Sequence, residues 1–438
     1  MPFRFPLIDR YAGAIADPVG DLFTALSAPD VISFAGGVPD PELFRAEELR
    51  ASFDWVLTHR GRRALQYGTS EGDPGLRELA ASRMGRWLPT TGAQVQITSG
   101  SQEGIYLTAL VMLNPGDAIL VEQPTYLAAV QAFGLVGARM IGVDSDAEGV
   151  RPDALADAIA RHRPRAVYLN PTYSNPTGRA MSLERREAVA RVLLGTDVAL
   201  VEDDPYGELR FDGPALPPIA SLPGMAERTL LLNSLSKVLA PGMRLGWIRG
   251  EGPIMKALAV AKGAVTMQSP ALNQLAAAHY LRHHDLDAHI DSVIGLYRER
   301  RDAMHAGLVD LLPAGAEVTR PDGGMFCWVS LHDGSDTAPL LADAVRHGVA
   351  YAPGWSFYAN DPDRSTMRLS FVTNPPDVIA EGLRRLAATL AERRARGAPG
   401  RRGRIQGLRA GSPRRRDRAE RAQPHGRRDA PDERIAGS

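Results

Sequence analysis

Short apolar runs alternate with helical patterns between residues 95 and 250, and this alternation restricts the fold more than any other feature. The run at residues 198–202 is apolar up to its last residue, whereas a half-buried strand would alternate apolar and polar side chains. Continuous runs are typical of strands that helices cover on both faces. Strands that alternate with helices predict a mostly parallel sheet with right-handed crossovers, and therefore an α/β fold class.

The elements fall into two groups along the chain. In the first group, strands are expected at residues 95–98, 118–122, 139–143, 166–170, 198–202, 229–233 and 245–249, and helices at 46–60, 74–88, 101–113, 126–134, 152–161 and 183–194. In the second group, one long helix is expected at 272–309, strands near 325–330, 350–353 and 367–371, and helices at 338–347 and 376–394. The second group predicts a smaller α+β domain.

The chain of 438 residues exceeds the usual size of one hydrophobic core, so two domains are expected. We predict an N-terminal segment at 1–47 that packs with the small domain, a large domain at 48–270, a small domain at 271–392 and a basic disordered tail at 393–438. The tail has 15 Arg against five acidic residues, which gives it a charge of +10 and leaves −10 for the rest. A solvated extension is favoured over a nucleic-acid arm, because charge without a fold is weak evidence for binding.

Lysine is rare in this chain, with only Lys237, Lys256 and Lys262 beside 48 arginines. Arginine serves wherever a positive charge is enough, so the retained lysines are candidates for chemistry that a guanidinium cannot perform. Cys327 is the single cysteine, which excludes an intrachain disulfide. The chain also lacks an apolar run of 18 residues and a secretion-like N-terminus, so we expect a cytoplasmic protein outside the membrane.

Two strand ends carry side chains suited to bind a phosphorylated carbonyl compound. Lys237 follows a strand and can condense with an aldehyde, while Ser234, Ser236 and Arg244 can bind a phosphate. Glu202, Asp203 and Asp204 lie at the end of another strand, where a carboxylate could hold a pyridine nitrogen protonated. Taken alone, each segment could equally be a surface loop or an acidic turn.

Two further loops follow strands and present polar groups. Asn175 precedes a proline, which favours a turn with the amide presented outward. Ser101 begins a helix after Gly100, and free N–H groups at a helix start bind phosphate. The alternatives are a structural turn and an ordinary helix cap.

Together these segments resemble the fold-type I, pyridoxal 5′-phosphate (PLP)-dependent aminotransferases of class I/II, most closely the 2-aminoadipate and kynurenine-type branch. The resemblance covers about residues 18–392, in order and with family-like spacing. It is carried by residues 32–37, 39, 41–44, 65–68, 72, 76–77, 99–102, 175–178, 202–206, 236–237, 244, 321, 323–326 and 367–370. It implies a large domain with a mostly parallel sheet, a smaller α+β domain and PLP as the cofactor.

The resemblance also implies roles for individual residues. Lys237 carries the cofactor and moves the proton between the substrate Cα and the cofactor, and Asp203 pairs with the pyridine nitrogen. Asn175 and Tyr206 bind the phenolic oxygen, and Tyr126 stacks on the ring. The expected catalytic residues are therefore Lys237, Asp203 and Tyr206.

The phosphate and the substrate have their own expected partners. The phosphate partners are Ser101, Gln102, Ser234, Ser236 and Arg244. Tyr67 is expected to reach the phosphate of a neighbouring subunit, which implies a homodimer with shared active sites. Arg368 is expected to bind the substrate α-carboxylate through a bidentate pair, together with Gly37 and Asn175.

The implied activity is ping-pong transfer of an amino group from an L-amino acid to a 2-oxo acid. The 2-aminoadipate branch uses an arginine of the N-terminal helix for an acidic side chain, where this chain has Gly20. Neutral, aromatic and arylglycine-type substrates are therefore at least as strongly favoured as 2-aminoadipate-like ones. Another PLP-dependent reaction, such as β-lysis, decarboxylation or racemisation, is the main alternative.

Three other interpretations are weaker. Residues 68–72 fit the Gly-x-Ser-x-Gly pattern of α/β-hydrolases, but no apolar strand precedes them. A transcription regulator that carries this fold would need a DNA-binding domain before it, and about 17 residues are too few. The polar cluster at 283–289 contains three histidines but lacks a further ligand set, so no metal site is expected. No nucleic-acid partner is expected either, because the basic tail does not replace a DNA-binding domain.

Overall fold

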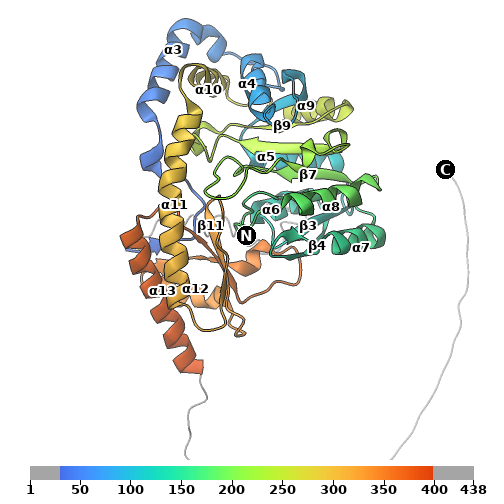
Figure 1. Cartoon of the computed structure of the whole chain (residues 1–438). Helices are drawn as coiled ribbons and strands as arrows, with labels where there is room; N and C mark the ends of the chain where they lie inside the picture. Colours follow the sequence, from blue (N-terminus) through green and yellow to red (C-terminus); the bar gives the residue numbers. More distant parts are fainter. Residues whose placement is uncertain (1–29, 398–438) are drawn as a thin grey trace, which may run out of the picture. The chain divides into compact units, whose positions relative to one another are not determined.

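The computed structural model describes residues 30–397, and its largest feature is a mixed sheet covered by helices (Figure 1). Among the described residues, the sheet has eight strands in the order β2-β9-β8-β7-β6-β3-β4-β5. Their bounds are β2 Val95–Thr98, β3 Ala118–Gln123, β4 Arg139–Asp146, β5 Gly149–Val150, β6 Ala166–Leu169, β7 Ala199–Asp203, β8 Thr229–Ser234 and β9 Gly246–Arg249. The run β4-β3-β6-β7-β8 is parallel, whereas β9 is antiparallel to both of its neighbours. The predicted α/β class is confirmed.

Helices cover both faces of this sheet, which explains the continuous apolar runs. Val121 of β3 packs with residues of α5 Ser101–Met112 and α6 Leu127–Leu135, whereas its neighbour Leu120 packs with residues of α7 Pro152–His162 and α8 Leu183–Leu194. Successive strand residues therefore enter separate cores. A further helix, α9 Pro253–Val265, lies on the α5 side and had not been predicted.

Later parts of the chain form a smaller antiparallel sheet. Its strands are β10 Glu317–Val318, β11 Phe326–Ser330, β14 Thr366–Ser370 and β13 Ala352–Pro353, in that order across the sheet. A separate parallel pair joins β1 Ile32–Ser33 to β12 Val349–Ala350. The other helices are α3 Ala46–Ala64, α4 Pro74–Met84, α10 Ala271–His283, α11 Leu286–Leu311, α12 Thr337–Arg346 and α13 Pro376–Gly397.

The prediction of one helix over 272–309 was wrong. The chain leaves helical geometry at His284, which is extended, and α10 and α11 are separate helices. Asp285 caps the second helix, because its side chain accepts a hydrogen bond from the N–H of Ala288 at 3.0 Å. In Figure 1, α11 runs from the region of α3 and α10 towards the smaller sheet.

Several predictions concern residues outside the described part of the chain. They are the part of the N-terminal segment before residue 30, the position of Gly20 and the disordered tail beyond residue 397. The boundaries between the four predicted segments remain predictions as well. No helix within residues 30–397 is both long and apolar enough to cross a membrane.

Candidate active site

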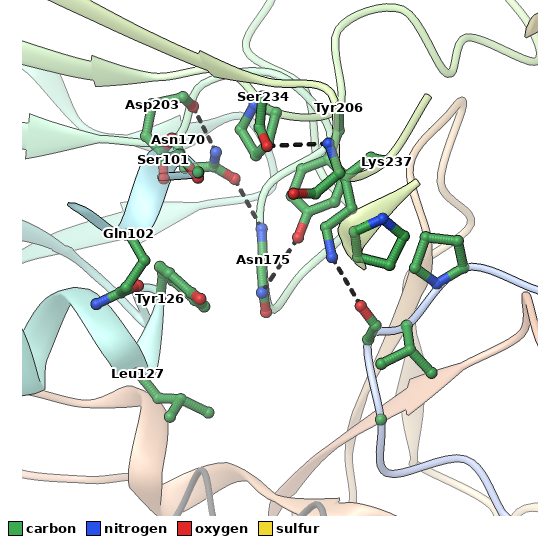
Figure 2. A pocket seen from close by; sticks show the side chains of 18 of the residues that line it. Ser101, Gln102, Tyr126, Leu127, Asn170, Asn175, Asp203, Tyr206, Ser234 and Lys237 are labelled. Atoms are coloured by element: carbon green, nitrogen blue, oxygen red, sulfur yellow. Dashed lines mark hydrogen bonds between the residues drawn. The ribbon is translucent and has the colours of Figure 1, made fainter. Parts of the chain in front are cut away.

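A cavity of about 260 Å³ opens where the carboxyl ends of β6, β7 and β8 meet the segment after β1 (Figure 2). The sheet edge explains the location, because ligands of open α/β sheets bind beyond the carboxyl ends of the strands. Predicted site residues that line the cavity are Gly37, Ser101, Gln102, Tyr126, Asn175, Asp203, Tyr206, Ser234, Ser236, Lys237, Arg244 and Arg368.

Tyr67 is the one predicted site residue that does not line this cavity. Its side chain is 74% exposed, and it borders a different cavity together with Arg63 and Gln268. A contribution of Tyr67 to this site therefore requires a second chain.

The Lys237 amine lies inside the cavity, in the turn that follows β8. Its Nζ donates a hydrogen bond to the backbone carbonyl of Gly37 at 2.8 Å. Loss of hydration lowers the pKa of Lys237 to about 8; Arg368 and Arg244 act in the same direction, and Asp203 opposes them. A large fraction of the amine is therefore neutral near pH 8 and able to attack a carbonyl carbon.

Asp203 ends β7 and has one free carboxylate oxygen. Its Oδ2 accepts a hydrogen bond from the Tyr168 hydroxyl at 2.6 Å. Its Oδ1 is buried and has no partner among the described residues. Burial raises the pKa of Asp203 to about 7. An unpartnered buried carboxylate oxygen is costly, so this atom is suited to a hydrogen-bond donor of a bound group.

Arg368, on β14, is buried at the side of the cavity. It donates to Asn175 Oδ1 and to the backbone carbonyl of Ala35, both at 2.7 Å. Its guanidinium lies over the ring of Phe326, 4.2 Å from the centroid. Burial lowers the pKa of Arg368 to about 10, so the group stays cationic at neutral pH. Asn175 in turn donates to the Tyr206 hydroxyl at 3.4 Å.

The start of α5 forms a cup suited to an anion. Gly100 has a φ of +84°, and a Cβ at this position would lie 2.9 Å from Nη2 of Arg244. Arg244 Nη2 donates to the backbone carbonyl of Ser99 at 2.7 Å. The N–H groups of the first helical turn, which begins at Ser101, have no partners within the helix. Helix N-termini of this kind bind phosphate.

Sequence reasoning missed several residues of the site. Tyr168 holds Asp203, but an aromatic ring within an apolar strand indicates a core residue. Asn170 joins two strand ends, since its Nδ2 donates to the carbonyl of Asp203 at 2.5 Å and its Oδ1 accepts from the N–H of Asn175 at 2.8 Å. A polar residue directly after a buried strand was the available signal. Other cavity residues that were not predicted are Gly36, Val38, Pro39, Gly100, Leu127, Pro205 and Pro241.

Two of the weaker interpretations concern residues that the structure describes. Ser70, the central residue of the hydrolase-like pattern, follows helix α3 rather than a strand and does not line the cavity. Among residues 30–397, no group of three or more His, Cys, Asp or Glu side chains is arranged to hold a metal ion.

Comparison with known proteins identifies the class. The model of the family described as aminotransferase class I and II matches residues 29–386. The aromatic-amino-acid aminotransferase 1 of Thermococcus litoralis is 38% identical over 391 residues, which is 88% of this chain and 94% of that protein.

Two solved structures agree with this match. The kynurenine aminotransferase of Pyrococcus horikoshii, crystallised with pyridoxamine phosphate, has a TM-score of 0.84 and 37% identity over 88% of this chain and 97% of that one. The α-aminoadipate aminotransferase of Thermus thermophilus, complexed with N-(5′-phosphopyridoxyl)-L-leucine, has a TM-score of 0.84 and 35% identity over 89% of this chain and 98% of that one.

The fold is therefore that of the fold-type I PLP-dependent transferases. The chain belongs to the class I and II aminotransferase family and is an aminotransferase.

Proposed function

We propose that the cavity binds PLP and that the protein transfers the amino group of a neutral or aromatic L-amino acid to a 2-oxo acid. The observation that carries the proposal is the pairing of two groups in one cavity. Lys237 presents an amine with a lowered pKa, and Asp203 presents a buried carboxylate oxygen without a partner. A phosphorylated pyridine aldehyde matches both groups and the anion cup at the start of α5.

Each part of the cofactor has a partner in this proposal. The Lys237 amine holds the aldehyde carbon, and Asp203 Oδ1 accepts the N–H of the pyridine ring. Asn175 and Tyr206 hold the phenolic oxygen, and Tyr126 covers the ring. The residues assigned to the phosphate are Ser101, Gln102, Ser234, Ser236 and Arg244.

When bound, PLP supplies a conjugated ring that accepts the negative charge developing at the substrate α-carbon. The chain's own residues do the rest. Arg368 binds the substrate α-carboxylate and so fixes which α-carbon bond is broken. Lys237 Nζ would move the proton from the substrate α-carbon to the cofactor carbon that carried the aldehyde, and Asp203 would keep the proton on the ring nitrogen, which sustains the electron demand of the ring.

The lining of the cavity supports neutral and aromatic side chains. The cations that line it in the described part of the chain are Lys237, Arg244 and Arg368, and each has a role in the proposal above. The apolar residues of the lining include Val38, Pro39, Leu127 and Pro205. Among the described residues, a second substrate carboxylate would therefore find no arginine or lysine of its own.

A panel of amino acids tests the substrate class. We expect phenylalanine, leucine and phenylglycine to convert the PLP form to the pyridoxamine form at least about tenfold faster than aspartate or 2-aminoadipate. Burial of an unpaired carboxylate costs more free energy than a tenfold difference in rate represents. Stopped-flow absorbance measures each half-reaction, and the D-enantiomers serve as controls. Faster conversion by the dicarboxylates would overturn this substrate class. Release of carbon dioxide would instead favour decarboxylation, and release of ammonia together with a 2-oxo acid, without the pyridoxamine form, would favour β-lysis.

The lowered pKa of Lys237 predicts how cofactor capture depends on pH. Only the neutral amine attacks, so the rate at which the apo protein captures PLP rises as the pH approaches 8 and levels off above it. Stopped-flow absorbance between pH 6 and pH 10 measures the capture rate below and above the lowered pKa of Lys237. A rate that keeps climbing towards 10.5, the ordinary pKa of lysine, would contradict the lowered pKa.

We further propose that the enzyme is a homodimer in which Tyr67 reaches the phosphate bound by the partner subunit. Leu65, Tyr67 and Met267 are more than half exposed, and Gln268 accepts a hydrogen bond from the N–H of Gly68, which connects their two segments. Exposed apolar side chains gathered around a tyrosine fit a protein interface. We also propose that the protein is cytoplasmic, as its lone cysteine led us to expect.

A further inference from the structure

A buried ion pair joins helix α9 to helix α5. Nζ of Lys262 lies 2.5 Å from Oε2 of Glu103, and the two side chains are 0% and 9% exposed. Burial alone would favour the neutral acid, but hydrogen bonds from Lys262 and Thr266, together with the charge of Lys262, hold the pKa of Glu103 below its ordinary value. Lys262 is one of only three lysines in a chain that otherwise uses arginine.

Both members of the pair are connected to Ser99. Glu103 Oε2 accepts the backbone N–H of Ser99 at 2.6 Å, while Lys262 Nζ donates to Ser269 Oγ at 3.0 Å. The hydroxyls of Ser269 and Ser99 lie 3.1 Å apart and share a hydrogen bond. The other oxygen of Glu103 accepts the Thr266 hydroxyl at 2.6 Å. Both the backbone and the side chain of Ser99 are therefore fixed.

Ser99 is the residue on which the anion cup depends. Its carbonyl accepts the hydrogen bond from Arg244 at 2.7 Å. The next residue, Gly100, has a left-handed φ of +84°, and Ser101 then begins α5. A shift of Ser99 would move the arginine and the first turn of the helix at the same time.

Stability gives little reason to keep this pair. Replacing a buried ion pair by well-packed apolar residues is often neutral or stabilising, because the desolvation of two charges offsets their attraction. What two charged partners provide is a fixed geometry, since their hydrogen bonds are short and directional. The geometry that is fixed here belongs to the cup rather than to the surface of the protein.

We propose that Lys262 and Glu103 are positioning residues for the phosphate group of the cofactor. They hold Ser99 so that Arg244, the Ser101 hydroxyl and the free N–H groups of α5 face the phosphate together. The inference rests on the proposed binding of PLP in this cavity. It predicts a defect that is selective for the phosphate and leaves recognition of the pyridine ring intact.

The test compares two ligands that differ only in the phosphate. Apo protein is titrated with PLP and with pyridoxal, and the dissociation constants are read from absorbance and intrinsic fluorescence. For Lys262→Met, we expect the affinity for PLP to fall roughly tenfold or more, as for one lost charge-assisted hydrogen bond, and that for pyridoxal to change less than about twofold. The matched control is Lys256→Met, an exposed lysine of the same helix.

Glu103→Gln is the second variant, because it removes the charge while nearly preserving the shape. It is expected to show the same selective loss, and it decides the question if Lys262→Met does not fold. Equal weakening of both ligands, or no weakening of either, would overturn the positioning role. Failure of the wild-type protein to bind PLP would overturn the proposed function instead, so the two failures are distinguishable.

Discussion

Lys237→Ala is expected to abolish transamination, with kcat reduced by about 10⁴-fold or more. The variant loses both the amine that attaches the cofactor and the group that moves the proton at the substrate α-carbon. Because the anion cup and Asp203 remain, PLP should still bind, although more weakly. Steady-state assays with the best amino donor of the panel, together with PLP titration, measure the two effects separately.

The control for this variant is Lys256→Ala. Lys256 is exposed on α9 and does not line the cavity, so its removal is expected to leave kcat within about twofold of the wild-type value. A Lys237→Ala protein that keeps substantial activity, with the control unchanged, would show that another group performs the proton transfer.

Asp203→Asn is expected to lower kcat by about 10³-fold, which is of the order found when one preorganised electrostatic partner is removed from an active site. The asparagine oxygen can still accept the hydrogen bond from Tyr168. The side chain, however, loses the negative charge that keeps the ring nitrogen protonated. We therefore expect a fold indistinguishable from wild type by circular dichroism, and a much slower half-reaction with the amino donor.

The neighbouring carboxylate provides a matched control. Asp204 lines a different cavity, of about 420 Å³, together with Asn233 and Trp247. It accepts a hydrogen bond from the N–H of Gly207 at 2.9 Å, which an asparagine oxygen can also accept. Asp204→Asn is expected to change kcat less than about fivefold. Equal losses in the two variants would mean that local structure, rather than the charge of Asp203, explains the effect.

The local sequence pattern was sufficient to predict most strands of the large sheet. Strand β2 and helix α8 begin and end where the sequence predicted, since each is a clear pattern bounded by polar or glycine residues. The break between α10 and α11 was harder to predict, because a polar stretch such as 283–289 also fits the exposed face of a continuous helix. The capping side chain of Asp285 was the local signal that distinguishes the two.

Other features depend on partners that lie far away in the sequence. The run at 350–353 was expected to be one strand, but it is interrupted at Tyr351. Its first part, in β12, pairs with β1, whereas its second part, in β13, pairs with β14. The same extended segment thus serves two sheets, which no local pattern encodes.

The active site shows the same difference between features that the local sequence predicts and features that depend on distant partners. Residues in recognisable motifs, such as Lys237, Asp203 and Arg368, come together in one cavity as the resemblance implied. The residues that hold these side chains in place were harder to predict, because an aromatic ring in an apolar strand indicates a core residue. Only the structure shows the Tyr168 hydroxyl bonded to Asp203. The role of Tyr67 stays a prediction, since it depends on a second subunit.

The central claim is that Lys237 carries the cofactor, and reductive trapping tests it most directly. The protein is incubated with PLP, reduced with borohydride, digested and analysed by mass spectrometry. We predict a phosphopyridoxyl group on the peptide that contains Lys237 and none on the peptides of Lys256 or Lys262. A modification on either of the other lysines, or no modification at saturating PLP, would contradict the assignment of the active site.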